Sequence, residues 1–195
     1  MKLRARSPLA DVAVAVGDAL RRAGIRAILT GGACANLYSG GMFQSLDADF
    51  VLAGSCTVQD LDHALTALGF ERKRDRYVHQ VVPFFVEFPR GPLGIGGDFH
   101  IRPVWRSRGG AKTLALSATD ACRDRLAAFY HWNDRQSLAA AVAIAVRNRV
   151  ALRKVRVWSR SEGHLGGYAV FLADVGEARR AGRRRRPIRR SQPKR

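Results

Sequence analysis

The spacing of apolar residues over the first 70 positions predicts helices and short strands in alternation. After Pro8, apolar residues recur every three or four positions, which predicts an amphipathic helix that ends near Gly24. Residues 25–30 form a short apolar run that is typical of a buried strand, and residues 33–38 predict a brief helix. A second strand is expected over residues 46–52. The helices should pack on the sheet that these strands form.

The rest of the chain predicts more strands and then only helices. Thr57, with Asp60 three residues later, has the pattern of a capping box and should begin a helix that Gly69 ends. The glycine-rich segment 91–97 is expected to be a hairpin connection rather than a cover over a ligand. The further elements expected are strands over residues 70–74, 80–88, 99–105 and 113–116, and helices over residues 119–132, 133–148, 152–160 and 165–177. The predicted fold class is therefore α+β, with a small mixed β-sheet flanked by helices and followed by a C-terminal helical region.

The charge of the chain is strongly positive, with 34 Lys and Arg against 16 Asp and Glu, a formal net charge of +18. Ten of these bases and no acid lie from Arg179 onward, in a segment with few apolar residues that we expect to be a disordered tail. Residues 1–178 still carry 24 bases against 16 acids. This balance favours a polyanionic partner such as nucleic acid. A general preference for Arg in the composition, with a merely solvated tail, would give the same count.

Membrane insertion and disulfide bonding are both disfavoured by the sequence. No apolar stretch approaches the roughly 18 to 20 residues that a bilayer span needs. The cysteines, Cys34, Cys56 and Cys122, are odd in number and far apart, which argues against a zinc site and a disulfide framework. We therefore expect a soluble protein of the reducing cytoplasm with no membrane partner.

Two carboxylates one residue apart, Asp47 and Asp49, lie on the strand expected over residues 46–52. Side chains alternate between the two faces of a strand, so these two acids should point the same way. Magnesium takes oxygen ligands from one or two carboxylates and shares its other sites with substrate phosphates. The double glycine Gly31-Gly32 lets the backbone approach a phosphate, at a helix start that favours anions. The pattern indicates phosphoryl or nucleotidyl transfer.

These motifs together resemble the nucleotidyltransferase superfamily typified by DNA polymerase beta. The features that carry the resemblance are the glycines at 31–32, the acids at 47–49 and an isolated acid between hydrophobic residues at 86–88. The segments 38–41 and 44–51 are most similar to bacterial proteins of the abortive-infection toxin type, many of them uncharacterised. The likeness covers about residues 25–175. It implies a nucleotidyltransferase core domain over residues 1–117 and a helical region over residues 118–178 that completes the cleft, with the disordered basic tail over residues 179–195.

The resemblance also implies the roles of individual residues. Asp47, Asp49 and Glu87 would be the catalytic and metal-binding residues and would hold two Mg²⁺ ions, one for the triphosphate and one for the acceptor hydroxyl. The residues implied for nucleotide binding are Gly31, Gly32, Ser45, Arg123 and Asp134. The reaction would transfer a nucleoside monophosphate from an NTP to an acceptor, for which the basic charge favours RNA and tRNA in particular. A toxin–antitoxin role would add an antitoxin as a protein partner.

Two departures from the family pattern bear on activity. Gly32 stands where many active members have Ser, and no basic residue lies between Gly32 and Asp47 to contact a phosphate. The basic residues that could supply this charge from elsewhere are Lys73, Arg74, Arg102, Arg106, Lys112, Arg123 and Arg125. The alternative hypothesis is therefore a catalytically inactive nucleotidyltransferase fold that binds nucleic acid or regulates another protein.

Overall fold

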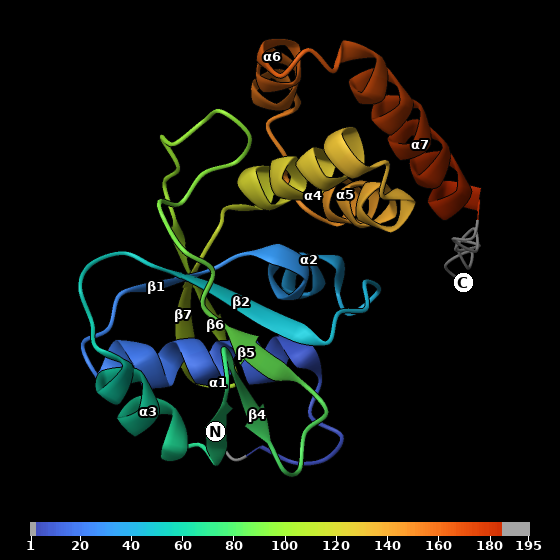
Figure 1. Ribbon diagram of the computed structural model, residues 1–195. Coiled ribbons are helices and arrows are strands. Elements are labelled where there is room, and N and C mark those ends of the chain that lie inside the picture. The colour runs from blue at the N-terminus through green and yellow to red at the C-terminus, as the bar shows by residue number, and fades with distance from the viewer. Residues whose placement is uncertain (1–2, 185–195) are drawn as a thin grey trace, which may run out of the picture.

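Seven strands form one mixed sheet in residues 3–184, the part of the chain that the computed structural model describes (Figure 1). The strands are β1 (Ala27–Leu29), β2 (Asp47–Leu52), β3 (Phe70–Lys73), β4 (Arg76–His79), β5 (Phe85–Glu87), β6 (Val104–Arg108) and β7 (Ala111–Ala115). Their order across the sheet is β3-β4-β5-β2-β1-β7-β6. β2 runs parallel to β5 and β1 runs parallel to β7, while the other neighbours are antiparallel. The predicted α+β class with a mixed sheet is confirmed.

The helices pack on this sheet and on one another. They are α1 (Leu9–Arg22), α2 (Gly31–Ser39), α3 (Val58–Thr66), α4 (Ala118–Trp132), α5 (Arg135–Arg147), α6 (Leu152–Ser161) and α7 (Leu165–Arg184). α1 packs against β1 and β7 and also contacts α2 and α3. Gly17 allows this close approach, because a Cβ atom there would overlap the Thr113 side chain of β7. The capping box predicted at the start of α3 is present, with Thr57 and Asp60 bonded reciprocally.

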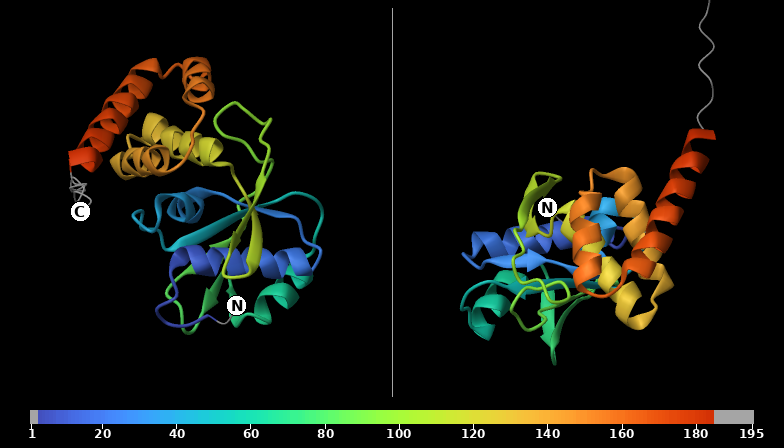
Figure 2. Two further views of the ribbon diagram at one scale, coloured as in Figure 1. Left: turned by 180° about the vertical axis from the view of Figure 1, so that it is seen from behind. Right: turned by 90° about the horizontal axis from the view of Figure 1, so that it is seen from above.

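The four helices α4–α7 gather at one end of the molecule, and α7 lies on the outside, away from the sheet (Figure 2). α2 joins the two parts, since it packs against β2 on one side and against α4 and α5 on the other. The buried apolar residues form one cluster that runs from Leu9 of α1 to Val175 of α7. The sheet and the helical region therefore share a single core.

Two predicted strands are placed differently in the structure. The strand expected over 80–88 is only β5, because the backbone amides of Val81 and Val82 donate to Nδ1 of His79, at 2.9 and 3.3 Å, and turn the chain there. The strand expected over 99–105 begins at Val104 and runs through Arg108. It forms a hairpin with β7 through two glycines at 109–110 that both have positive φ.

The helix ends also differ from the predictions. α4 begins at Ala118, one residue before its predicted start, and the hydroxyl of Ser117 caps it by accepting from the amide of Asp120 at 3.1 Å. α7 continues to Arg184, so the tail predicted to be disordered from Arg179 is helical over 179–184, and Arg179 donates to the carbonyl oxygen of Ala145 at 3.0 Å. The remainder of that predicted tail, 185–195, lies outside the described residues. None of the helices within residues 3–184 is long and apolar enough to cross a membrane.

Candidate functional site

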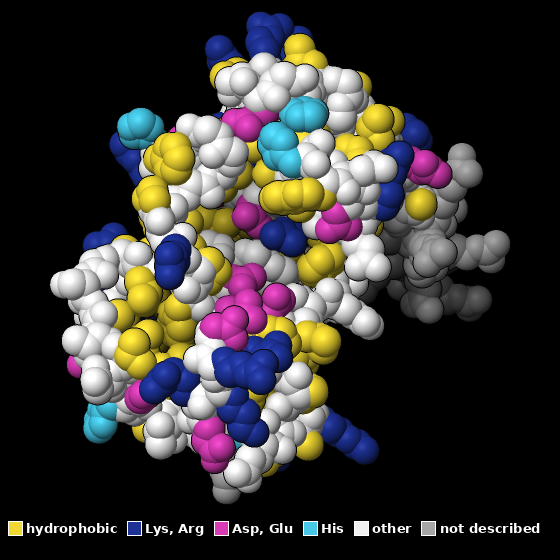
Figure 3. Space-filling model, viewed as in Figure 1, with side chains coloured by type: hydrophobic (Ala, Val, Ile, Leu, Met, Phe, Trp, Pro, Cys, Tyr) yellow, Lys and Arg dark blue, Asp and Glu magenta, His cyan; other side chains and the backbone are white. Residues whose placement is uncertain are grey.

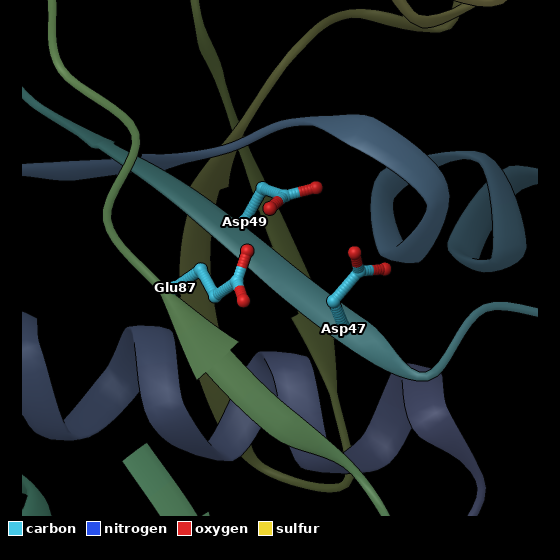
Figure 4. A group of neighbouring side chains, drawn as sticks. All are labelled: Asp47, Asp49 and Glu87. Atoms are coloured by element: carbon cyan, nitrogen blue, oxygen red, sulfur yellow. The ribbon is translucent and has the colours of Figure 1, made fainter. Parts of the chain in front are cut away.

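Three carboxylates meet on one face of the sheet where β2 and β5 lie side by side. In the parallel register of these strands Asp49 is opposite Glu87, and Asp47 lies two residues earlier on the same face as Asp49. One carboxylate oxygen from each of the three lies within 4.8 Å of the others (Figure 4). Ala48 and Val86, which alternate with them, point to the opposite face and are fully buried. The strand period therefore places the acids together while the intervening residues anchor them in the core.

Bringing three acids together perturbs the most enclosed of them. Burial, and after it the negative charges of Asp47 and Glu87, together raise the pKa of Asp49 to about 7. The guanidinium of Arg125 opposes this shift. Ionising Asp49 costs free energy when no cation is nearby. A bound cation would remove that cost, so the group favours cation binding. The donor set consists only of carboxylate oxygens, which are the ligands that magnesium prefers.

The first turn of α2 faces this acidic group. The amide of Thr30 donates to the carbonyl oxygen of Asp49 at 2.9 Å, which ties the start of α2 to β2. Gly31 has a φ of +63°, and a Cβ atom at this position would overlap the Asp49 carboxylate. The first helical hydrogen bond runs from the amide of Cys34 to the carbonyl oxygen of Thr30 at 3.2 Å. The amides of residues 31–33 are therefore the donors that a helix start offers to an anion.

Ser45 explains the glycine at position 32. A Cβ atom on Gly32 would lie 2.5 Å from Oγ of Ser45 and 2.7 Å from its Cβ, so a serine at position 32 would collide with Ser45. Ser45 itself brings a hydroxyl to that place and donates to the carboxylate of Asp47. Asn36 of α2 holds the loop that carries Ser45 by donating to the carbonyl oxygen of Phe43 at 2.5 Å. The hydroxyl of Ser45 thus lies where a side chain at position 32 would be.

Arg125 of α4 is a basic residue whose charge acts on Asp49. Its guanidinium is bonded to the neighbouring Asp124 at 2.8 and 3.0 Å and lies 6.0 Å from the centre of the Phe43 ring. The side chain is 16% exposed, so a charge at this position is only partly screened by water. Asp124 and Arg125 both act on the pKa of Asp49, the first raising it and the second lowering it. Arg125 therefore places a positive charge from the helical region near Asp49.

Arg123, the other arginine considered for nucleotide binding, is held elsewhere. Its side chain is 1% exposed and forms ion pairs with Asp98 at 2.6 Å and Asp120 at 2.9 Å. Its guanidinium also lies 5.0 Å from the centre of the Trp158 ring of α6. Arg123 thus connects the loop before β6 to α4 and α6. This arrangement assigns it a structural contact rather than a contact with the three carboxylates.

Asp134 caps α5 and interacts with Arg125 both through its charge and through Ser137. Its carboxylate accepts from the amides of Gln136 and Ser137, at 2.9 and 3.1 Å. The Ser137 hydroxyl donates to Asp134 at 2.7 Å and lies 3.5 Å from Nη1 of Arg125. Asp134 therefore orients Ser137, and Ser137 touches the arginine that faces the carboxylates.

A hollow separates the sheet from the helical region in the space-filling view (Figure 3). Acidic side chains gather at its lower edge, and hydrophobic, basic and histidine side chains form the wall above them. The sequence did not single out this upper wall, apart from Arg125, although the helical period of α4 carries the relevant signal. The sequence did not single out Asp124 either, yet its charge raises the pKa of Asp49.

Comparison with known proteins supports this assignment at the level of the fold. No family model matches the chain, and no curated protein matches it either. The chain is similar in structure to an antigenic nucleotidyltransferase-like protein from Paracoccidioides brasiliensis, with a TM-score of 0.53 and 19% sequence identity. The match covers 71% of this chain and 74% of that protein. A sequence identity of 19% indicates a shared architecture only. The chain therefore has an α+β nucleotidyltransferase fold, with three carboxylates that could hold a metal ion at the edge of a hollow.

Proposed function

We propose that this protein is a Mg²⁺-dependent nucleotidyltransferase that transfers a nucleoside monophosphate from an NTP to an acceptor hydroxyl. The observation that carries the proposal is the group of Asp47, Asp49 and Glu87, whose carboxylate oxygens converge within 4.8 Å beside the first turn of α2. A purely structural role does not explain the group, since assembling the acids raises the pKa of Asp49 to about 7. The free-energy cost of ionising Asp49 would be offset when divalent cations and a triphosphate bind beside the three carboxylates.

The three carboxylates would together bind two Mg²⁺ ions. Bound Mg²⁺ would neutralise triphosphate charge and lower the pKa of the acceptor hydroxyl. The amides at Gly31 and Gly32 would donate hydrogen bonds to phosphate oxygens, and Ser45, whose hydroxyl donates to Asp47, would hold that carboxylate in place beside them. Arg125 would compensate negative charge from the opposite wall of the hollow. These residues act mainly by holding the triphosphate in position, the main contribution that a protein makes to phosphoryl transfer.

The acceptor that we propose is RNA, with tRNA as the first candidate. The support is the net charge of +18, which would draw a polyanion to the surface and disfavour a cationic acceptor. Membership of a toxin–antitoxin system is a further part of this proposal. An antitoxin would be recognised as a second protein that copurifies with the chain and suppresses its activity.

The alternative is an inactive fold that binds nucleic acid or regulates a partner. This alternative was suggested by the glycine at position 32 and by the lack of a basic residue between Gly32 and Asp47. Ser45 and Arg125 each bring the corresponding group to the site from another position. The presence of both groups favours an active enzyme over the inactive alternative.

The test is transfer of label from each of the four NTPs to total cellular RNA in the presence of Mg²⁺. We expect labelling by the wild type and none by the Asp47→Asn/Asp49→Asn double variant, which keeps the side-chain sizes. Asp75→Asn is the matched control, because Asp75 is an exposed acid in the turn between β3 and β4. Equal labelling by the double variant would refute the mechanism. Salt-sensitive RNA binding by a wild type that binds no NTP would favour the inactive alternative.

A further inference from the structure

Trp132, the last residue of α4, has the most exposed large hydrophobic side chain within residues 3–184, at 76%. It follows Arg125 by seven residues in the same helix. Seven residues span two turns of an α-helix, so the two side chains leave the axis within about 20° of each other and about 10 Å apart along it. Trp132 therefore lies on the side of α4 that carries Arg125, two turns nearer the C-terminal end of the helix.

A group of aromatic rings supports this end of α4. His131 lies edge-on to Trp132, with ring centres 6.2 Å apart, and also edge-on to His164 at 5.1 Å. His164 is stacked on Tyr130 at 4.8 Å. Glu162 fixes the arrangement from the turn between α6 and α7, with its carboxylate 3.6 Å from Nε2 of His131. The indole of Trp132 is thus braced on one side while most of it remains open to solvent.

Trp132 presents an exposed indole two turns from Arg125, the arginine that we propose to act on the phosphates. A nucleobase would cover this apolar surface more favourably than water does. Stacking on a base removes apolar surface of both rings from solvent and is tolerant of base identity. The phosphates of the same nucleotide are attracted in the opposite direction, toward Arg125 and the cations that Asp47, Asp49 and Glu87 would hold. Arg125 and Trp132 are about 10 Å apart along α4, a separation that a ribose and its phosphates bridge.

We propose that Trp132, braced by His131, is the stacking site for the base of the incoming NTP. This inference rests on the proposed function, because it takes the triphosphate to be bound at the three carboxylates. It assigns to the helical region the part of the nucleotide that the carboxylates and the first turn of α2 do not reach. The site should accept purines more tightly than pyrimidines, since the larger base covers more of the indole.

The experiment compares binding of an NTP with binding of inorganic tripolyphosphate, both with Mg²⁺ and both measured by calorimetry. The variants are Trp132→Ala and Trp132→Phe, and Trp105→Ala is the matched control because Trp105 is also exposed, at 56%, on the edge strand β6. We expect Trp132→Ala to weaken NTP binding about tenfold and to leave tripolyphosphate binding unchanged. Trp132→Phe should retain most of the affinity, and Trp105→Ala should match the wild type.

Several outcomes would overturn the inference. Unchanged NTP affinity in Trp132→Ala would do so, as would an equal loss for NTP and tripolyphosphate, which would indicate a disturbed fold. Weaker binding of a short RNA oligonucleotide alone would assign Trp132 to the acceptor, and a change only in oligomeric size on gel filtration would assign it to a contact between copies. A wild type that binds neither NTP nor tripolyphosphate would instead refute the proposed function and the stacking site with it.

Discussion

Replacing Asp49 by Asn should remove a pH-dependent loss of stability from the metal-free protein. The pKa of Asp49 rises from its usual value near 3.9 to about 7 on folding, because of burial and the neighbouring charges of Asp47 and Glu87. A raised carboxyl pKa contributes stability that is fully present below pH 4 and is lost as the pH rises through 7. A tenfold change in acidity is worth about 1.4 kcal/mol, so this rise amounts to about 4 kcal/mol. Screening by water at this half-buried carboxyl reduces it to about 2 kcal/mol.

The assay is urea unfolding in the presence of a chelator at pH 5, 6, 7 and 8. The free energy of unfolding of the wild type should fall by about 1 kcal/mol more than that of Asp49→Asn between pH 5 and pH 8, because part of the loss has already occurred below pH 5. Addition of Mg²⁺ at pH 8 should restore the wild type and have little effect on the variant, since binding to the folded state alone stabilises it. Asp75→Asn, at an exposed turn, should follow the wild type throughout. Parallel pH profiles for the wild type and Asp49→Asn would refute the reasoning.

Three further changes test other parts of the site. Gly32→Ser should lower the free energy of unfolding by about 1 to 3 kcal/mol in a thermal or urea melt, and adding Ser45→Gly should recover most of it, because the two side chains compete for one place. Arg125→Ala should reduce kcat/KM for NTP by about 10- to 100-fold, with a smaller loss for Arg125→Lys; equal rates would contradict its role. Removal of residues 185–195, which carry six bases and no acid, should reduce the salt dependence of RNA binding, lowering the slope of log K against log salt by up to about 4 in a titration series.

The family pattern in the sequence and the local geometry agree over β1, α2 and β2. The alternation that puts Asp47 and Asp49 on one face of a strand follows from the covalent structure of the chain and needs no partner. The cap at Thr57 is equally local, and both predictions are present in the structure. Where the sequence prediction failed, as for the strand expected over 80–88, a side chain intervened: His79 accepts two backbone amides and turns the chain.

The sequence by itself determined which acids form the group that could hold a metal ion, because strand period, residue type and spacing are properties of the chain. Tertiary structure decided which basic residue faces that group. Arg123 and Arg125 are two positions apart, and so about 200° apart around α4, which means that only the packing of the helix selects between them. Tertiary structure also decided that Ser45 takes the place of a side chain at position 32, because a folded loop brings it there. Contacts between residues distant in the chain have no period in the sequence, and folding alone creates them.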